Sequence, residues 1–335
     1  MDPLLSASSM TGTPRDRAGT GGPALPIPAV AHFIWFGASL PWVYRLAIRS
    51  AAIRGGFERV VLHHEPALRD SADVDELTAI VGVELRPLDP EAVLEAAPNG
   101  GVLVDVYRSV TWPAARANLM RAAILYAEGG VYLDTDTVTV RSFDMLRNDT
   151  AFCGEERVVY PAGVRGSRDP EVRATAWLRG SVRAVLRTLP GGWRGFRRIE
   201  GWYPRAVNNA VLGAAPRHPF IEQLLRAMAQ VPAESRTVRF ALGTHLLQRE
   251  VARWRGPPEV AVHPPAVFYP LGPEISTHWF RTGTANLDDV IRPETRLVHW
   301  YASVRTRELV PRIDRAYVEA RADRELFSAL ALPFG

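Results

Sequence analysis

The sequence predicts an α/β protein built on a sheet with parallel strands. Short apolar runs rich in β-branched and aromatic residues alternate with helical stretches, the strand–helix–strand order recurs, and glycines end several of the runs. The chain has 335 residues, of which 47% are hydrophobic and 23% are charged, as in ordinary globular proteins. This length allows one large domain or two of average size.

The first elements follow this order. Residues 1–26 are rich in Ser, Thr, Gly and Pro without periodicity, so we expect a disordered leader there. Structure is expected to begin at Ile27, with a buried strand over residues 29–37. A helix from about residue 41 to residue 54 and two further strands, at residues 59–63 and 83–88, are predicted next.

Residues 113–128 predict a helix that begins with Pro113 and ends at Gly129-Gly130. The following residues 131–140, VYLDTDTVTV, predict a strand. Two acidic residues, Asp134 and Asp136, come at the end of its apolar part. Since side chains alternate along a strand, these carboxylates share a face, at the strand end where open α/β sheets bind ligands.

Residues 157–205 differ in composition from the rest of the chain. They contain 11 Arg and only 3 acidic residues, with aromatic residues between them. On the helix expected within this stretch, Leu178 and Val185 face one way, and Arg179, Arg183 and Arg187 face another. The three arginines are expected either to form a solvated helix face or to meet an anionic acceptor or a membrane surface, with nucleic acid as a third alternative.

After residue 207 the pattern alternates between helices and short strands. The expected helices cover residues 219–230, 243–253 and 312–330, and the expected strands cover residues 260–262 and 296–299.

Composition excludes several classes of function. The chain has no lysine, which excludes a Walker-type phosphate loop and Schiff-base chemistry. Its single cysteine, Cys153, has no partner for an internal disulfide or a cysteine zinc site, and no apolar run approaches the length of a membrane span. The net charge of +4 is far from that of a nucleic-acid binder. We therefore expect a soluble cytoplasmic protein.

The Asp134–Asp136 pair needs a positive partner, because two carboxylates at the end of a buried strand repel each other. A divalent cation held together with a diphosphate supplies that charge, and hard oxygen ligands suit Mg²⁺ or Mn²⁺.

The run ARANLMRAAILYAEGGVYLDTDTV resembles the DXD-containing sugar-binding region of glycosyltransferases related to family thirty-two. These include capsular-polysaccharide transferases, initiating mannosyltransferases and the clostridial glucosylating toxins. The residues that match the pattern of this region are Arg121, Gly129, Gly130, Tyr132, Asp134 and Asp136. Further matches follow in family order, in the opening strand (Ile27, Pro28, His32, Trp35, Gly37), in the Asn208-Asn209 to Pro219 segment, and at His299 and Ser303.

The resemblance implies a GT-A domain over residues 27–335, which is a Rossmann-like nucleotide-sugar-binding fold with a mixed sheet flanked by helices. Residues 157–205 would be an Arg- and aromatic-rich insertion on the acceptor side. The implied activity is metal-dependent, retaining transfer of a hexose in polysaccharide biosynthesis, with Mn²⁺ or Mg²⁺. A UDP-hexose is favoured as the donor over GDP-mannose. The implied acceptor is a glycan, a lipid-linked molecule or a small molecule, and the basic insertion suggests peripheral membrane contact.

The resemblance also implies residue roles. Asp134, Asp136 and Arg121 would be catalytic, and the metal ligands would come from Asp134, Asp136, His299 and Ser303. The donor would contact Trp35, His32, Asn118, Arg121, Tyr132, Asp134, Asn208 and Asn209. Trp35 would stack on the base, and Arg121 would be a charged clamp on the donor.

Three of these residues have a second interpretation. His32 fits a hydrogen-bonded core histidine, and Trp35 fits a core aromatic residue. One of Asn208 and Asn209 is expected to contact the sugar and the other to cap a helix.

Two departures from the family pattern leave other functions open. Asn118 stands where the family has an acid, and Val304 stands where it has a tryptophan. These changes favour a catalytically weak nucleotide-sugar-binding relative. The run YLDTDTV also fits a haloacid-dehalogenase-like phosphatase that uses Asp134 and Asp136, although such enzymes normally use a lysine as well.

Overall fold

The structure is a computed structural model that describes residues 26–68, 74–238, 240–283, 285–304 and 306–335. Apart from Pro26, the expected leader lies outside the described residues.

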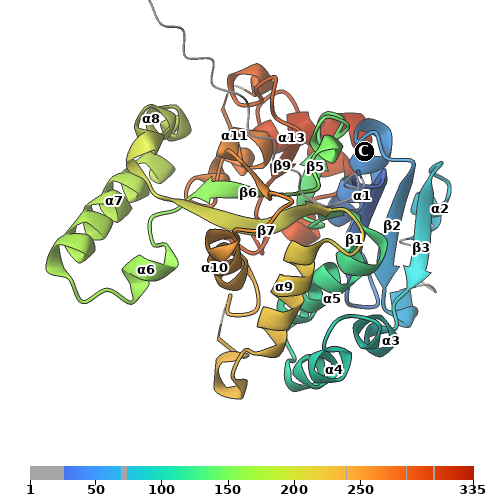
Figure 1. Cartoon of the computed structure of the whole chain (residues 1–335). Coiled ribbons are helices and arrows are strands. Elements are labelled where there is room, and N and C mark those ends of the chain that lie inside the picture. Colours follow the sequence, from blue (N-terminus) through green and yellow to red (C-terminus); the bar gives the residue numbers. More distant parts are fainter. Residues whose placement is uncertain (1–25, 69–73, 239, 284, 305) are drawn as a thin grey trace, which may run out of the picture.

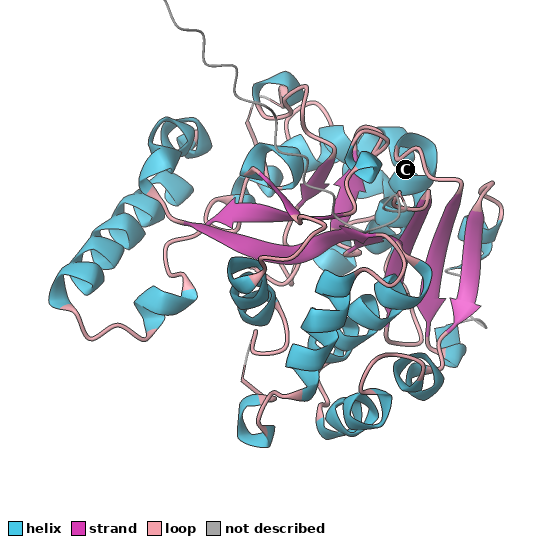
Figure 2. Ribbon diagram, in the orientation of Figure 1, coloured by secondary structure: helices cyan, strands magenta, loops and turns pink. Residues whose placement is uncertain are grey.

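A seven-stranded mixed sheet forms the centre of the molecule (Figure 2), with the strand order β3-β2-β1-β4-β7-β6-β8. The first four strands in this order are parallel, whereas β7 runs antiparallel to β4 and β6, and β8 runs parallel to β6. The strands are β1 (Val30–Trp35), β2 (Arg59–His64), β3 (Val83–Pro87), β4 (Gly130–Leu133), β6 (Ala151–Arg157), β7 (Arg205–Ala214) and β8 (Ala261–His263). A second, two-stranded sheet pairs β5 (Thr137–Thr139) with β9 (Leu297–His299).

Helices cover both faces of the large sheet (Figure 1), which confirms the predicted fold class. One face packs against α3 (Pro90–Glu95), α4 (Gly100–Ser109), α5 (Pro113–Glu128), α9 (Pro219–Ala229) and α10 (Thr244–Arg253). The other face packs against α1 (Trp42–Arg54), α2 (Asp75–Thr78) and α11 (Pro265–Phe268). The C-terminal helices α12 (Arg315–Glu319) and α13 (Leu326–Ala331) pack beyond this layer with the second sheet.

Strand β1 shows why the central strands are almost entirely apolar. Phe33 packs into the core on one face of the sheet and Ile34 into the core on the other. A strand that is covered on both sides can place few polar side chains without losing their hydration.

The two glycines after α5 allow β4 to start directly beside β1. Gly129 and Gly130 both have positive φ, of 67° and 98°. A Cβ at Gly130 would lie 2.6 Å from the Val30 carbonyl oxygen and 3.0 Å from His32 Nε2. Glycine is therefore required here by the backbone conformation and by the space available.

Two expected elements are interrupted. The strand predicted over residues 131–140 ends at Leu133 and resumes at Thr137, in the second sheet. Between them the chain turns, and the Thr137 hydroxyl donates to the Asp134 carbonyl oxygen at 2.7 Å. The helix expected over residues 312–330 is likewise divided into α12 and α13.

The insertion at residues 157–205 forms an arm that extends from the ends of β6 and β7, away from the body (Figure 1). It consists of α6 (Ala162–Arg165), α7 (Pro170–Thr188) and α8 (Gly192–Ile199). No helix in the described part of the chain has both the length and the apolar character needed to cross a bilayer.

The expectation of a solvated arginine face on α7 is wrong. Arg183 forms a salt bridge with Glu274 at 2.5 Å, in which both side chains are only 13% exposed. Arg179 lies over the Trp202 ring at 5.6 Å. The exposed face of α7 instead carries Trp177, Leu178 and Val185, which are 69%, 47% and 56% exposed. Arg183 and Arg179 turn inward because other elements supply an acid and an aromatic ring for them.

Candidate active site

Three ligand-type side chains meet where the two sheets adjoin. Asp134 follows β4, Asp136 precedes β5, and His299 ends β9. One ligand atom from each of these residues lies within 4.8 Å of the others. The pairing of β5 with β9 places Thr137 opposite His299, which brings the C-terminal part of the chain to the Asp-Thr-Asp turn.

Asp136 is held from both sides. His299 Nε2 lies 3.0 Å from its Oδ1, and the Ala302 amide donates to its Oδ2 at 2.8 Å. Burial acts to raise the pKa of Asp136, but the nearby His299 and the Ala302 amide hold it below its ordinary value. Burial acts to lower the pKa of His299, but the charge and hydrogen bond of Asp136 raise it above its ordinary value.

Asp134 is fixed by two side chains. Its Oδ1 accepts a hydrogen bond from the Tyr132 hydroxyl at 2.7 Å and lies 3.1 Å from Arg121 Nη2. Arg121 is 5% exposed, and its guanidinium lies 4.1 Å from the centre of the Tyr132 ring. Its Nη1 donates to the Asn209 carbonyl oxygen. The guanidinium contacts in this structure are therefore with protein groups, and they orient Asp134 and Asn209.

Asn118 and Asn209 form a second polar pair beside Arg121. Asn209 Nδ2 donates to Asn118 Oδ1 at 2.8 Å. A Cβ at Gly243 would lie 2.7 Å from Asn118 Nδ2 and 3.3 Å from Asn209 Nδ2. Asn118, Arg121, Asn209 and Gly243 line a small cavity between α5, β7 and the start of α10.

The expectation that Asn208 or Asn209 caps a helix is wrong, because both lie inside strand β7. Asn208 is 7% exposed, and its Oδ1 accepts a hydrogen bond from the Ala210 amide at 2.7 Å. Its side chain also lies near Glu156 and acts to lower the pKa of that carboxyl. The two asparagines therefore belong to different parts of the site.

His32 does not join the carboxylate cluster. It is fully buried, its Nε2 contacts the Gly129 carbonyl oxygen at 2.9 Å, and its Nδ1 contacts His63 Nε2 at 3.0 Å. Because a carbonyl oxygen only accepts, Nε2 of His32 carries the proton and Nδ1 accepts from His63. These bonds connect β1 to β2 and to the end of α5. They fit the interpretation of His32 as a hydrogen-bonded core histidine.

Trp35 and Ser303 lie at the edge of the site. Trp35 is half-buried at the end of β1, donates from Nε1 to the Ser39 carbonyl oxygen at 2.8 Å, and packs 4.9 Å from the Tyr44 ring. Ser303 is exposed and directly follows Ala302.

Three contributors to the site were missed by sequence reasoning. The Ala302 amide is a backbone donor and has no signature in the sequence. Glu156 and Tyr301 hydrogen-bond to each other at 2.7 Å next to His299, but lie 145 positions apart in the chain. No local pattern identifies such a pair.

The Asp134, Asp136 and His299 side chains fit a divalent cation. Two carboxylates and an imidazole supply the oxygen and nitrogen ligands that Mn²⁺ accepts, and Mg²⁺ prefers the oxygens. The cluster is also mostly shielded from solvent, since the Asp134, Asp136 and His299 side chains are 26%, 16% and 8% exposed.

Comparison with known proteins gives one family match. The model of the glycosyltransferase sugar-binding region containing the DXD motif matches residues 56–153. This range includes Arg121, Tyr132, Asp134 and Asp136. No curated protein matches the sequence.

Several solved structures are similar at low identity. The PaToxG glycosyltransferase is 14% identical over 68% of this chain and 70% of its own, with a TM-score of 0.45. Mouse xyloside xylosyltransferase 1 is 14% identical over 80% of this chain and 96% of its own, also with a TM-score of 0.45. The UDP-bound glycosyltransferase domain of the YGT toxin is 10% identical over 61% of this chain and 62% of its own, with a TM-score of 0.32.

The matched region contains both carboxylates and the helix that supports them. Residues 56–153 therefore match the DXD-containing sugar-binding region of glycosyltransferases, and their Asp134–Asp136 pair lies at the edge of a mixed α/β sheet.

Proposed function

We propose that the protein is a metal-dependent glycosyltransferase that moves a hexose from a nucleoside-diphosphate sugar. The observation that carries this proposal is the cluster of Asp134, Asp136 and His299, with ligand atoms within 4.8 Å of one another. Retention of the anomeric configuration is proposed from the family resemblance.

Each residue of the cluster has a proposed role. Asp136 and His299 would hold Mn²⁺ or Mg²⁺ together with Asp134. When bound, the cation supplies positive charge for the departing diphosphate. Arg121 would keep Asp134 in position through its 3.1 Å contact. Ser303 would complete the site from the exposed turn after Ala302.

The donor is proposed to lie between this cluster and the end of β1. The register of β1 and β4 pairs His32 with Tyr132, so Trp35 lies at the same sheet edge as the Asp-Thr-Asp turn. Its half-exposed ring suits stacking on a base. Asn118 and Asn209 are proposed to contact the sugar, and a UDP-hexose is favoured over GDP-mannose.

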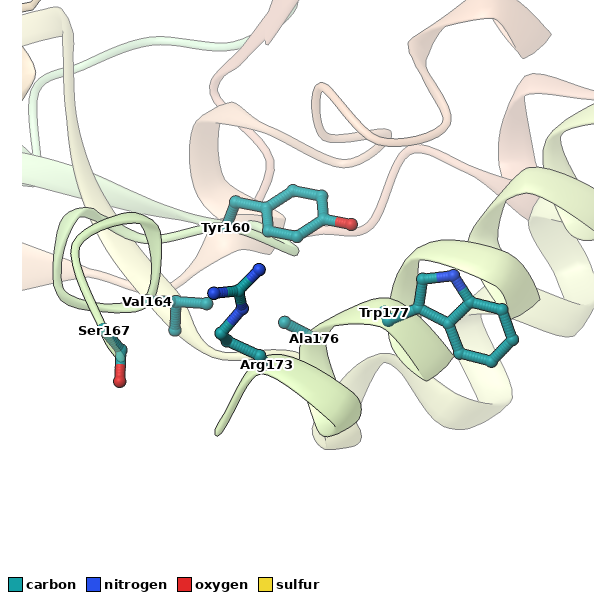
Figure 3. Close-up of a pocket in the computed structure, with 6 residues that line it drawn as sticks. All are labelled: Tyr160, Val164, Ser167, Arg173, Ala176 and Trp177. Carbon is teal, nitrogen blue, oxygen red and sulfur yellow. The ribbon is translucent and has the colours of Figure 1, made fainter. Parts of the chain in front are cut away.

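The arm is proposed to meet the acceptor. Tyr160, Val164, Ser167, Arg173, Ala176 and Trp177 line an open pocket of ≈ 370 Å³ on it. Figure 3 shows the Arg173 guanidinium directed toward the Tyr160 ring. Trp177, Leu178 and Val185 add an exposed apolar face on α7. Among glycan, small-molecule and lipid-linked acceptors, this surface favours a lipid-linked acceptor at a membrane surface.

The test is a panel of UDP- and GDP-sugars, with and without Mn²⁺, monitored for nucleotide release. We expect nucleotide release from one donor class, and only when the metal is present. Equal turnover in a chelator would contradict it. Phosphate release from simple monoesters would favour the phosphatase, and tight donor binding without turnover would favour a binding protein.

A further inference from the structure

A buried glutamate lies next to the metal-type cluster without belonging to it. Glu156, on β6, is 8% exposed, and its Oε2 accepts a hydrogen bond from the Tyr301 hydroxyl at 2.7 Å. Asn208 lies near this carboxylate and acts to lower its pKa. Burial raises the pKa of Glu156 above its ordinary value. Burying a carboxyl group costs free energy unless hydrogen bonds compensate for its lost hydration.

Tyr301 lies in the turn that brings the C-terminal segment to Asp136. It has a φ of 60°, in the left-handed region that residues other than glycine seldom adopt. The Thr306 hydroxyl lies 3.0 Å from the carbonyl oxygens of both Tyr301 and Ala302. The Tyr301 and His299 rings are 4.0 Å apart between centres. Tyr301 stands between His299 and Ala302 in the chain and packs against the His299 ring. The position of Tyr301 therefore affects both the imidazole and the Ala302 amide that contact Asp136.

We propose that the hydrogen bond between Glu156 and Tyr301 is an anchor that positions His299 and the Ala302 amide against Asp136. Glu156 is thus a positioning residue for the metal-type site, and it acts through Tyr301. The inference rests on the proposed function, because it assigns the anchored turn to the site that would hold the cation. Groups that orient metal ligands in this way commonly affect metal affinity about 10- to 100-fold.

The chain contains a matched pair for comparison. The Tyr317 hydroxyl donates to Glu325 Oε2 at 2.9 Å, and Glu325 is 2% exposed. This pair has the same chemistry but joins α12 to the start of α13. Tyr317→Phe therefore reports the general effect of removing a tyrosine–glutamate hydrogen bond.

The first measurement is Mn²⁺ binding to the full chain without donor, by electron paramagnetic resonance. Tyr301→Phe is expected to weaken binding about 10- to 100-fold. Glu156→Gln is expected to weaken it less, because a glutamine oxygen still accepts from the hydroxyl. Tyr317→Phe is expected to bind as the wild type does. Unchanged binding in Tyr301→Phe, or equal weakening in Tyr317→Phe, would overturn the anchor.

The second measurement separates the anchor from the proposed function. Hydrogen exchange of the Ala302 amide is followed in metal-free protein. Tyr301→Phe is expected to speed this exchange at least tenfold, and Tyr317→Phe is expected to leave it unchanged. Unchanged exchange in Tyr301→Phe would overturn the anchor even if the wild type binds Mn²⁺. A wild type that binds no Mn²⁺ would overturn the proposed function, and the exchange result would then decide the anchor alone.

Discussion

His299 Nε2 lies 3.0 Å from Asp136 Oδ1, although the two residues are 163 positions apart in the chain. The contact depends on the small sheet of β5 and β9, which is separate from the large one. The C-terminal part of the chain therefore completes a site whose carboxylates come from its centre.

Replacement of Arg121 should lower the stability of the protein. Arg121→Gln removes the buried cation beside Asp134 and leaves that carboxylate without its charged partner. We expect the free energy of unfolding to fall by about 2–3 kcal/mol, since unpairing a mostly buried charge is costly. Urea denaturation measures this loss.

The same helix provides a control for this change. Arg116 also lies over a tyrosine ring, 4.9 Å from that of Tyr107, and donates to the Val110 carbonyl oxygen. Among the residues that the structure describes, no Asp or Glu forms a salt bridge with Arg116. Arg116→Gln should cost less than about 1 kcal/mol. Equal losses in the two variants would contradict the role given to the Arg121–Asp134 pair.

Gly130 should not tolerate a side chain. In Gly130→Ala the new Cβ would meet the Val30 carbonyl oxygen at 2.6 Å, at a φ of 98°. We expect a loss of about 2 kcal/mol or more from the strained backbone and the displaced strand. Gly101→Ala, where nothing lies within 4 Å, should not destabilise the protein. Thermal unfolding compares the two, and similar melting temperatures would count against the close β1–β4 contact.

Stability should decrease in mild acid because of the buried histidine pair. Burial lowers the pKa of His32 to about 4 and that of His63 to about 2. The unfolded chain takes up these protons below its ordinary histidine pKa of about 6.5, whereas the folded protein does not. The stability that the neutral histidine pair contributes is therefore fully present above pH 6.5, and it is lost as the pH falls toward 4. At pH 5 each histidine should lower the free energy of unfolding by about 2 kcal/mol.

Urea denaturation at pH 7 and pH 5 measures this loss. His63→Gln keeps a donor for His32 Nδ1 but removes one titrating group. It should reduce the difference between the two pH values by about 2 kcal/mol. An unchanged difference would show that His63 is not buried in its neutral form.

The exposed face of α7 should act in surface binding and not in folding. A variant with Trp177, Leu178 and Val185 changed to Ser should lose sedimentation with liposomes that contain a lipid-linked glycan, with little change in melting temperature. Val81→Ser removes a side chain that is 96% exposed elsewhere and should have no effect. Arg183→Gln should instead lower the melting temperature, because Arg183 pairs with Glu274. Liposome binding equal to that of wild type in the triple variant would exclude this surface.

Local patterns were enough to predict much of the fold. The strands near residues 30, 60 and 83 and the helix over residues 113–128 follow directly from apolar periodicity and glycine positions. The same patterns placed Asp134 and Asp136 at a strand end. They failed within that strand, because the hydrophobic residues after Asp136 belong to a different sheet.

The remaining features depend on long-range partners. Arg183 turns inward because Glu274, 91 positions away, accepts its charge. Asn208 and Asn209 lie in a strand because this part of β7 pairs with β6, where Asn208 is opposite Gly154. The anchor of Glu156 and Tyr301 joins two segments that have no shared local pattern. In each case the deciding interaction is tertiary, so periodicity along the chain does not contain it.

The most direct test of the proposed metal-dependent transfer is nucleotide release from the preferred sugar donor as Mn²⁺ is added, in wild type and Asp136→Asn. Asp105→Asn, on the exposed side of α4, is the control. Wild type and the control are expected to release nucleotide only when the metal is present, and Asp136→Asn is expected to lose at least about 100-fold while it still unfolds in one cooperative transition. Wild-type turnover in Asp136→Asn would contradict it.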